Sequence, residues 1–436
     1  MGRDLFGTDG VRGLVGQYPL DQAGAEQIGR AVGMYFAEAG QRILIASDPR
    51  ESSAELVASL ILGLTTVGVN VTTVGVIPTP GLAYLAREDG EFVAGVMVTA
   101  SHNKYEYNGI KVFDGNGDKL TDAIETELNS LIKSTIEARS SGTATENSTL
   151  AQAYEDFLVS SAGGLKLDGL HLAVDSANGA ASGLAERVFN RLGAQVTALF
   201  DKPDGKNINA GCGATDTKAL AETVVSNKLA AGIALDGDAD RVMLVDEQGR
   251  QLTGDHLLYI LAVSNKLDGV VGTVMANLGL DLAFKGQGIK FDRAKVGDRY
   301  VLEDLEQTGF RLGGEQSGHI IFPELLKTGD GLLAAVQTLL AVANSGKSLA
   351  EWRDEIKMVP QALVNIPLED NSQLERPEVK AFLQEQTEAL GAAGRLLIRP
   401  SGTEPLARVM VEAPDAQKTA QQIAERLQEL LGSKSS

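Results

Sequence analysis

Three aspartates alternate with other residues in the segment DGDADR, residues 236–241, between the apolar runs AGIAL and VMLV. In an extended chain, residues two apart share a face, so Asp236, Asp238 and Asp240 are predicted to converge. Carboxylates that close repel one another unless a cation lies among them, and oxygen ligands favour Mg²⁺ or Ca²⁺. An EF-hand is strongly disfavoured, because Arg241 stands where that loop requires glycine and the run VMLV continues as a strand. The segment therefore predicts a hard-cation site, with a solvated acidic turn as the alternative.

A serine follows another apolar run. The run FVAGVMV, residues 92–98, leads directly into TASHN. A buried strand that ends in polar residues delivers a side chain to the carboxyl edge of the sheet, where open α/β folds bind their ligands. Ser101 would then present a hydroxyl there, unless the segment is only a strand-ending turn. Ser101 and His102 are not expected to form a catalytic pair, because adjacent side chains in an extended chain diverge.

Two more loops combine glycine with polar side chains. In GGEQSGH, residues 313–319, Glu315 and Ser317 could point together at the hydroxyls of a polar ligand. In RPSGTEP, residues 399–405, Arg399 with two hydroxyls and exposed backbone N–H groups would make a phosphate-binding nest, with a hairpin turn as the alternative. Together with the serine and the aspartates, these loops supply nearly every part that phosphoryl transfer to a sugar needs.

Composition narrows the class of protein. The 436 residues include 39 Lys and Arg against 58 Asp and Glu, a net charge of −19, which argues against nucleic acid or an anionic membrane as partner. The single cysteine, Cys212, excludes an intrachain disulfide and fits a reducing compartment. The N-terminal residues do not resemble a signal peptide, and there is no apolar run of about 18 residues. A cytoplasmic location is therefore expected.

The elements that must position these loops repeat along the chain. Three stretches each read as strand, polar loop, helix, glycine and strand. A period of about 100 residues predicts three related α/β domains with mixed sheets. Their first strands are predicted at residues 43–48, 170–175 and 272–278, and their helices from near Ser52, around Leu184 to Leu192, and over Leu280 to Gly286.

The last segment is different. A strand at residues 362–366, a helix at 377–390, two strands around RPSGTEP and a final helix predict a smaller α+β domain. The small polar segment 140–149 reads as a linker after the first domain. The expected domains are residues 1–148, 149–251, 252–358 and 359–436.

The four loops resemble, in order and along essentially the whole chain, those of the α-D-phosphohexomutase superfamily. TASHN is similar to its phosphoserine loop, DGDADR to its metal loop, GEQSGH to its sugar loop and RPSGTEP to its phosphate loop. The segment FGTDGVRG near the start and the last two loops, GEQSGH and RPSGTEP, resemble the corresponding segments of the bacterial branch that acts on glucosamine phosphates. The resemblance implies three related α/β domains and a smaller fourth, arranged around a central active-site cleft.

The implied activity is the interconversion of glucosamine 6-phosphate and glucosamine 1-phosphate, on the route to UDP-N-acetylglucosamine. It would proceed through a phosphoserine enzyme and glucosamine 1,6-bisphosphate, and that bisphosphate or glucose 1,6-bisphosphate would serve as the activator. A kinase or autophosphorylation would first load Ser101, and a homodimer is left open. The alternatives are a phosphomannomutase/phosphoglucomutase with the same loops, a metal-dependent phosphatase and a non-catalytic sugar-phosphate binder.

The resemblance also assigns roles to residues. Ser101 would carry the phosphoryl group and share one Mg²⁺ with the three aspartates, and Lys111 would be a proton carrier, against a plain reading as a solvated strand residue. Some mutases of the neighbouring branch have a histidine 21 residues before the sugar-loop histidine; here Asp298 stands there, which favours a different sugar. The implied transfer-site residues are Ser101, Arg12, His102, Lys111 and Arg241; the metal ligands Ser101, Asp236, Asp238 and Asp240; and the substrate-binding residues Glu315, Ser317, His319, Arg399, Ser401, Gly402, Thr403 and Arg408.

Overall fold

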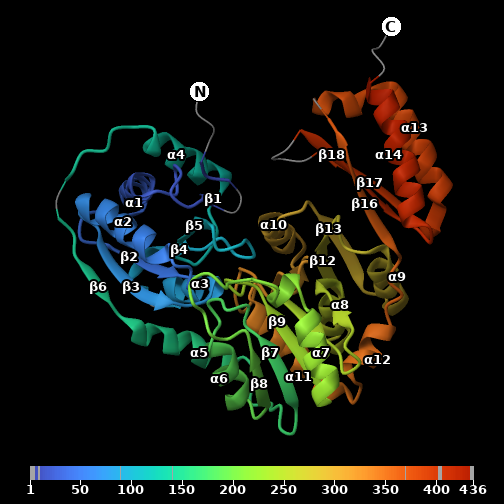
Figure 1. Ribbon diagram of the computed structural model, residues 1–436, viewed down its shortest axis with the longest axis horizontal. Helices are drawn as coiled ribbons and strands as arrows, with labels where there is room; N and C mark the ends of the chain where they lie inside the picture. Colours follow the sequence, from blue (N-terminus) through green and yellow to red (C-terminus); the bar gives the residue numbers. More distant parts are fainter. Residues whose placement is uncertain are drawn as a thin grey trace. The chain divides into compact units, whose positions relative to one another are not determined.

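The computed structural model describes residues 5–7, 10–88, 90–139, 141–368, 370–400 and 405–432. The chain divides into two compact units: Met1–Met275 with Ile289–Asp354, and Ala276–Gly288 with Glu355–Ser436 (Figure 1). The first unit contains three sheets flanked by helices, and the second contains one small sheet. The prediction of three α/β domains followed by a smaller α+β domain is confirmed. Within the described ranges, no helix combines the length and apolar character needed to cross a membrane.

The first sheet has the strand order β1-β5-β4-β2-β3-β6, and β5 is antiparallel to both of its neighbours. Side chains of β2 alternate between two cores: Ile43 and Ile45 pack with α1, α2 and α4, whereas Leu44 and Ala46 pack with α3 on the other face (Figure 1). The elements are β1 (Val11–Leu14), α1 (Gln22–Phe36), β2 (Arg42–Ser47), α2 (Ser53–Thr66), β3 (Asn70–Val76), α3 (Thr79–Glu88), β4 (Phe92–Val98), β5 (Tyr107–Asp114), α4 (Asp122–Ile132), β6 (Ala144–Glu146) and α5 (Ala151–Ser160).

One part of the predicted linker belongs to this sheet. Residues Ala144–Glu146 form β6, which pairs in parallel with β3 at the edge of the sheet. The side chain of Asn70 accepts hydrogen bonds from the backbone and the hydroxyl of Thr143, just before the strand begins. Small polar residues are typical of a linker, but an open sheet edge can pair with any extended segment that passes it.

The second sheet has the order β11-β10-β9-β7-β8. β9 and β10 are antiparallel, with Leu235 opposite Val242, so residues 236–241 connect two buried strands. Leu220 and Val224 of α7 pack in one core with strand residues of this sheet. The elements are β7 (His171–Asp175), α6 (Leu184–Arg191), β8 (Gln195–Leu199), α7 (Lys218–Asn227), β9 (Ala231–Leu235), β10 (Val242–Val245) and β11 (Gln251–Leu252).

The third sheet has the order β13-β12-β14-β15. The strand predicted at residues 272–278 ends earlier, at Thr273. The Thr273 hydroxyl accepts a hydrogen bond from the Met275 N–H, which turns the chain, and Asn277 then caps the helix that follows. α10 contributes Val301 and Leu305 to the core of this sheet. The elements are α8 (Gly254–Ser264), β12 (Gly269–Thr273), β13 (Lys290–Ala294), α10 (Asp298–Thr308), β14 (Gly313–Gly314), β15 (Ile320–Ile321), α11 (Gly331–Ser345) and α12 (Leu349–Asp354).

The second unit contains the antiparallel sheet β16-β18-β17. Val409 and Val411 of β18 pack against Ile423 and Leu427 of the last helix, as the stripe in the sequence predicts. The elements are α9 (Leu278–Gln287), β16 (Gln361–Pro367), α13 (Pro377–Leu390), β17 (Arg395–Pro400), β18 (Leu406–Glu412) and α14 (Ala416–Gly432).

Ion pairs join the first and third domains inside the first unit. Lys119, after β5, pairs with Asp298 at the start of α10, and both side chains are largely buried. The next residue, Arg299, pairs with Glu125 of α4 at 2.5 Å. Because these charges lie away from water, each depends on its partner.

Asp298→Ala is expected to lower the midpoint of thermal unfolding by several degrees. Removing one partner of a buried ion pair typically costs about 3–5 kcal/mol. Thermal denaturation followed by circular dichroism measures the effect. Arg311→Ala is the control, because the Arg311–Glu324 pair is exposed and such pairs contribute at most about 1 kcal/mol. Equal losses in the two variants would contradict the structural role of Asp298.

Candidate active site

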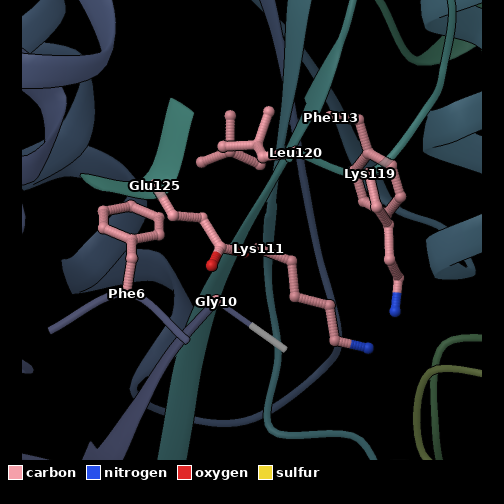
Figure 2. Close-up of a pocket in the computed structure, with 8 residues that line it drawn as sticks. Phe6, Gly10, Lys111, Phe113, Lys119, Leu120 and Glu125 are labelled. Carbon is pink, nitrogen blue, oxygen red and sulfur yellow. The ribbon is translucent and has the colours of Figure 1, made fainter. Parts of the chain in front are cut away.

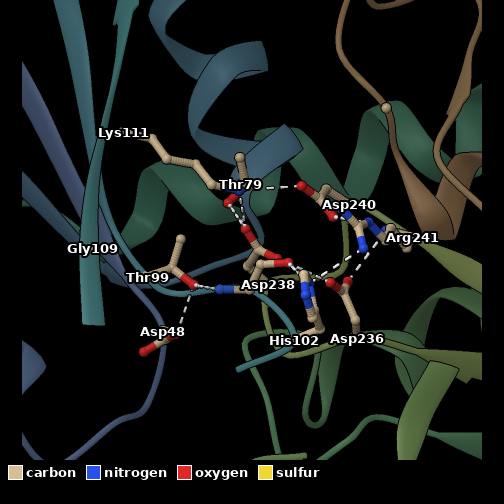
Figure 3. Close-up of polar contacts among 12 residues, drawn as sticks. Asp48, Thr79, Thr99, His102, Gly109, Lys111, Asp236, Asp238, Asp240 and Arg241 are labelled. Atoms are coloured by element: carbon tan, nitrogen blue, oxygen red, sulfur yellow. Dashed lines mark hydrogen bonds and ion pairs between the residues drawn. The ribbon is translucent and has the colours of Figure 1, made fainter. Parts of the chain in front are cut away.

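The loop after β4 meets the loop between β9 and β10. Ser101, near the start of the first of these loops, is buried, and its Oγ donates to Asp236 Oδ2 at 2.7 Å. The two residues come from different domains and are 135 positions apart in the chain. The structure thus brings together the serine and the acidic loop that the sequence singled out separately. Figure 3 shows His102, the residue after the serine, beside Asp236.

The Ser101 and His102 side chains do not diverge as expected. Ser101 Oγ lies 3.2 Å from His102 Nδ1. The expectation assumed an extended chain, but Ser101 has a φ of 51°, in the left-handed region. This conformation turns the two side chains towards each other. His102 Nδ1 also accepts from Arg241 Nη1 at 3.2 Å, whereas the one proton of the Ser101 hydroxyl is donated to Asp236.

The three aspartates converge, but through a turn and not through an extended segment. Ala239 has a φ of 55°, and its N–H donates to the carbonyl of Asp236 at 3.0 Å. The tight turn brings one oxygen of each of Asp236, Asp238 and Asp240 within 4.8 Å of the others. The predicted convergence is therefore present, while the period-two argument for it was wrong.

The environment of the three aspartates decides whether their oxygens fit a cation. Burial and then the charges of Asp240 and Asp238 raise the pKa of Asp236 well above its usual value. Asp238 Oδ2 accepts from Thr79 Oγ1 at 2.6 Å and from Lys111 Nζ at 2.7 Å. Asp238 Oδ1 and Asp240 Oδ1 are buried and accept no hydrogen bond from the described residues. Since unsatisfied buried carboxylate oxygens are costly, and hard cations prefer such ligands, the residues present fit Mg²⁺.

Lys111 lies beside this turn. It is a residue of β5 that is 4 % exposed, and its Nζ lies 3.2 Å from Asp240 Oδ2 as well as contacting Asp238. The plain reading of Lys111 as a solvated strand residue is therefore excluded. Its stem and that of Lys119 line a cavity of about 20 Å³, and in Figure 2 both stems extend in the same direction, away from Phe6.

Two arginines lie near the serine loop. Arg12, in β1, donates through Nη1 to Asn103 Oδ1 at 3.2 Å. The backbone N–H of Arg241 donates to Asp236 Oδ1 at 3.2 Å, and its Nε lies 3.7 Å from Asp240 Oδ1. Two guanidinium groups thus lie beside the serine and the acidic turn in a chain whose net charge is −19, and such groups can pair with the oxygens of an anionic ligand.

His102 is expected to stay neutral in the dephosphorylated protein throughout the physiological range. Burial, followed by the charges of Arg241 and Arg12, lowers its pKa to about 4. The unfolded chain then binds more protons between about pH 4 and 6.5, so this contribution to stability is complete above that window and is lost as the pH falls through it. An NMR titration of the imidazole protons measures the midpoint, which Arg241→Ala should raise. A midpoint near 6.5 in the wild type would contradict the expectation.

The predicted sugar loop forms a turn around Glu315. Ser317 Oγ donates to Glu315 Oε2 at 3.4 Å, and the N–H of Gly297 donates to Glu315 Oε1 at 3.1 Å. His319 Nε2 lies 3.1 Å from Asp298 Oδ2. Burial lowers the pKa of His319, but the hydrogen bond and charge of Asp298 outweigh it and raise the pKa above its usual value. His319 Nδ1 lies 3.9 Å from Asp240 Oδ2, so this loop reaches the acidic turn.

The predicted phosphate-binding residues lie in the second unit. Arg399 of β17 and Arg408 of β18 are directly opposite each other in the antiparallel pair. They alternate with the residues that form the core, so they share the face away from α14. Two guanidinium groups in this register favour an anion between them. Ser401, Gly402 and Thr403 lie outside the described residues.

Sequence reasoning missed several residues around the serine. Arg50, Asn209 and Thr79 all donate to the serine loop or to the acidic turn. Lys119 is the other omission, although its pairing with Asp298 joins two domains. A weak signal existed for Arg50, because the sequence DPR follows the strand Arg42–Ser47 at the same edge of the sheet as TASHN.

Comparison with known proteins agrees with this fold. All four domains described as phosphoglucomutase/phosphomannomutase match: domain I over residues 3–139, domain II over 152–249, domain III over 253–359 and the C-terminal domain over 363–430. The chain therefore belongs to the phosphoglucomutase/phosphomannomutase family of the phosphohexomutase superfamily, and it is an isomerase of the mutase type.

Individual relatives indicate which members of the family the chain is similar to in sequence and in structure. The chain is 45% identical to the phosphoglucosamine mutase of Thermus thermophilus over 432 residues, which cover 98% of each protein. It is 43% identical to that of Alcanivorax borkumensis, over 96% of each protein. A family member from Burkholderia thailandensis has a TM-score of 0.82 at 26% identity, covering 99% of this chain and 98% of that one. An N-acetylphosphoglucosamine mutase from Aspergillus fumigatus shares the fold at 19% identity, with a TM-score of 0.67 over 98% and 96% of the two chains.

Proposed function

We propose that this protein interconverts glucosamine 6-phosphate and glucosamine 1-phosphate, through a phosphoserine at Ser101 and glucosamine 1,6-bisphosphate, for UDP-N-acetylglucosamine synthesis. The observation that carries the proposal is the hydrogen bond between Ser101 Oγ and Asp236, beside two carboxylate oxygens that accept no hydrogen bond from the described residues. Relatives at about 45% identity that are named phosphoglucosamine mutases support glucosamine as the sugar.

The protein's own residues would divide the work of transfer. Ser101 gives its phosphoryl group to the free hydroxyl of the bound sugar phosphate and later takes back the other one. Asp236 accepts the Ser101 proton when the serine becomes phosphorylated, because Oδ2 is already its hydrogen-bond partner. Arg241 and Arg12 would stabilise the charge on the transferred group, since phosphoryl transfer depends mainly on positioning and charge neutralisation. A sugar bisphosphate, a kinase or autophosphorylation would supply the first phosphoryl group.

The metal ligands are proposed to be Asp236, Asp238, Asp240 and an oxygen on phosphorylated Ser101. A bound Mg²⁺ would supply Lewis-acid stabilisation of the phosphoryl oxygens. Lys111 is the proposed proton carrier, because its ammonium is held by the same two carboxylates.

The substrate contacts are proposed for two loops. Glu315 and Ser317 would read the sugar 3- and 4-hydroxyls, with His319 beside them. Arg399, Arg408 and residues 401–403 would bind the phosphate that is not being transferred, in the bidentate geometry that arginine offers.

The test is a coupled assay with glucosamine 6-phosphate, glucose 6-phosphate and mannose 6-phosphate, each with catalytic glucose 1,6-bisphosphate. The proposal predicts the highest kcat/KM for the glucosamine compound. A preference for mannose or glucose phosphate would instead identify a phosphomannomutase/phosphoglucomutase. Stoichiometric release of inorganic phosphate would identify a phosphatase, because a mutase returns the group to the sugar.

Glu315→Ala is expected to change the relative preference among these sugar phosphates by about 10-fold or more. Glu315 is half-buried, and an acceptor that is partly shielded from water discriminates because the wrong hydroxyl arrangement leaves it unpaired. The same three-substrate assay measures the change. Glu324→Ala is the control, since Glu324 pairs with Arg311 at an exposed position. An unchanged preference with a uniformly raised KM would contradict the sugar-reading role.

A further inference from the structure

The guanidinium group of Arg50 donates five hydrogen bonds. Four of them go to backbone carbonyls within residues 101–107, which follow β4, and one goes to Asp48. Nη2 donates to the carbonyls of Ser101 at 2.9 Å and Asn103 at 2.8 Å. Nη1 donates to the carbonyls of Lys104 at 2.5 Å and Tyr107 at 3.1 Å. The fifth donor, Nε, is 2.8 Å from Asp48 Oδ2. An arginine that is 2 % exposed thus holds three carbonyls of the loop after β4 and the carbonyl of the first residue of β5.

The N–H and the carbonyl of Ser101 are both linked to the Asp48 carboxylate, each through one intervening side chain. The Ser101 N–H donates to Thr99 Oγ1 at 2.9 Å, and Thr99 Oγ1 donates in turn to Asp48 Oδ2 at 2.7 Å. Figure 3 shows this path from Asp48 through Thr99. The Ser101 carbonyl reaches the same carboxylate through Arg50. The backbone of Ser101 is therefore fixed on both sides by the buried Asp48–Arg50 ion pair.

The backbone conformation of Ser101 is one that serine rarely adopts without such contacts. The φ of 51° at Ser101 lies in the left-handed region, which L-residues populate at a cost of about 1–2 kcal/mol. Strained residues persist only where surrounding contacts over-determine them. In a different conformation, Ser101 Oγ would not point at Asp236.

Residues of the second domain also contact the backbone of Ser101. Asn209 Nδ2 donates to the carbonyls of Ser101 at 2.9 Å and Asn103 at 3.1 Å, the two that Arg50 Nη2 also contacts. A Cβ at Gly237 would lie 2.5 Å from the Ser101 carbonyl, so the acidic turn approaches this point as closely as glycine allows. Two domains therefore meet at the carbonyl that Arg50 fixes.

We propose that Arg50, anchored by Asp48, is a positioning residue for phosphoryl transfer: it fixes the strained Ser101 backbone and so aims Oγ at the acidic turn and the incoming phosphoryl group. The role rests on the proposed function, in which Ser101 is the phosphoryl carrier. It differs from a purely structural role because the loop carries the reacting atom, and small misplacements of reacting groups lower rates strongly.

Arg50→Lys tests the role. Lysine keeps the charge beside Asp48 but cannot reach four carbonyls at once. The kcat for glucosamine 6-phosphate should fall about 10- to 100-fold while the KM stays within about threefold, because the substrate contacts are elsewhere. The matched control is Arg30→Lys in α1, where a partly buried guanidinium also pairs with a carboxylate and a carbonyl; its kcat should stay within twofold of wild type.

Thr99 supplies a second pair of variants in case the lysine variant does not fold. Thr99→Val removes the hydroxyl that links Ser101 to Asp48, whereas Thr99→Ser retains it. The valine variant should lose kcat about 10-fold, and the serine variant should keep most of it. A folded Arg50→Lys protein, or a Thr99→Val protein, with wild-type kcat and only a lower melting temperature would overturn the positioning role. A wild-type protein that gained no phosphoserine from the bisphosphate would overturn the proposed function itself, which separates the two failures.

Discussion

Ser101→Ala is expected to lower mutase turnover by at least about 1,000-fold while the protein remains folded. The hydroxyl is the group that would be phosphorylated, and removing a catalytic nucleophile typically costs several orders of magnitude. Alanine fits the same φ of 51° about as well as serine, because both carry a Cβ. The measurements are the coupled assay for turnover and the intact mass after exposure to glucose 1,6-bisphosphate. The wild type should gain one phosphoryl group, and the alanine variant should gain none.

Ser59→Ala is the matched control for this prediction. Ser59 is another buried serine of the first domain, and its hydroxyl donates only to the Glu55 carbonyl of its own helix at 3.0 Å. Its turnover should stay within twofold of wild type. Turnover by Ser101→Ala within tenfold of the wild type would rule out Ser101 as the phosphoryl carrier.

The sequence predicts the layout of the fold well, because hydrophobic periodicity is local information. Runs such as ILIAS and FVAGVMV are buried strands, and the Leu56–Leu60–Leu64 spacing is a helix packed on one face of the first sheet. The end of the third domain's first strand was placed too late, because capping by Asn277 and the Thr273 turn compete with strand formation.

The candidate site is predicted less completely, because its geometry depends on contacts between domains. Residue types indicated Ser101 and the three aspartates, and those groups do meet. The approach of His102 to Ser101 could not be read from spacing, since it follows from a left-handed conformation that distant residues impose. Arg50 and Lys119 look like ordinary charged residues in the sequence; only the fold shows what they contact.

Chelation of divalent cations is expected to abolish turnover, and Asp238→Asn to lower it about 100-fold at limiting Mg²⁺. Asparagine replaces one hard oxygen ligand with an NH₂ group and removes a charge that faces Lys111 at 2.7 Å. Mg²⁺ titrations of activity should show a higher half-saturating concentration. Because a ligand that binds only the folded state raises its stability, Mg²⁺ should also raise the melting temperature of the wild type more than that of the variant.

The control for Asp238→Asn is Asp246→Asn, at the other end of β10. Asp246 is fully buried and accepts from the Gln248 and Arg250 backbones and from Arg250 Nε at 2.8 Å, so it supports a turn and not the acidic site. That variant should lose stability but keep the wild-type dependence of activity on Mg²⁺. The acidic turn differs from this structural aspartate in having buried carboxylate oxygens that accept no hydrogen bond from the described residues. Full turnover after exhaustive chelation, or the same Mg²⁺ dependence in both variants, would show that the turn does not hold the cation.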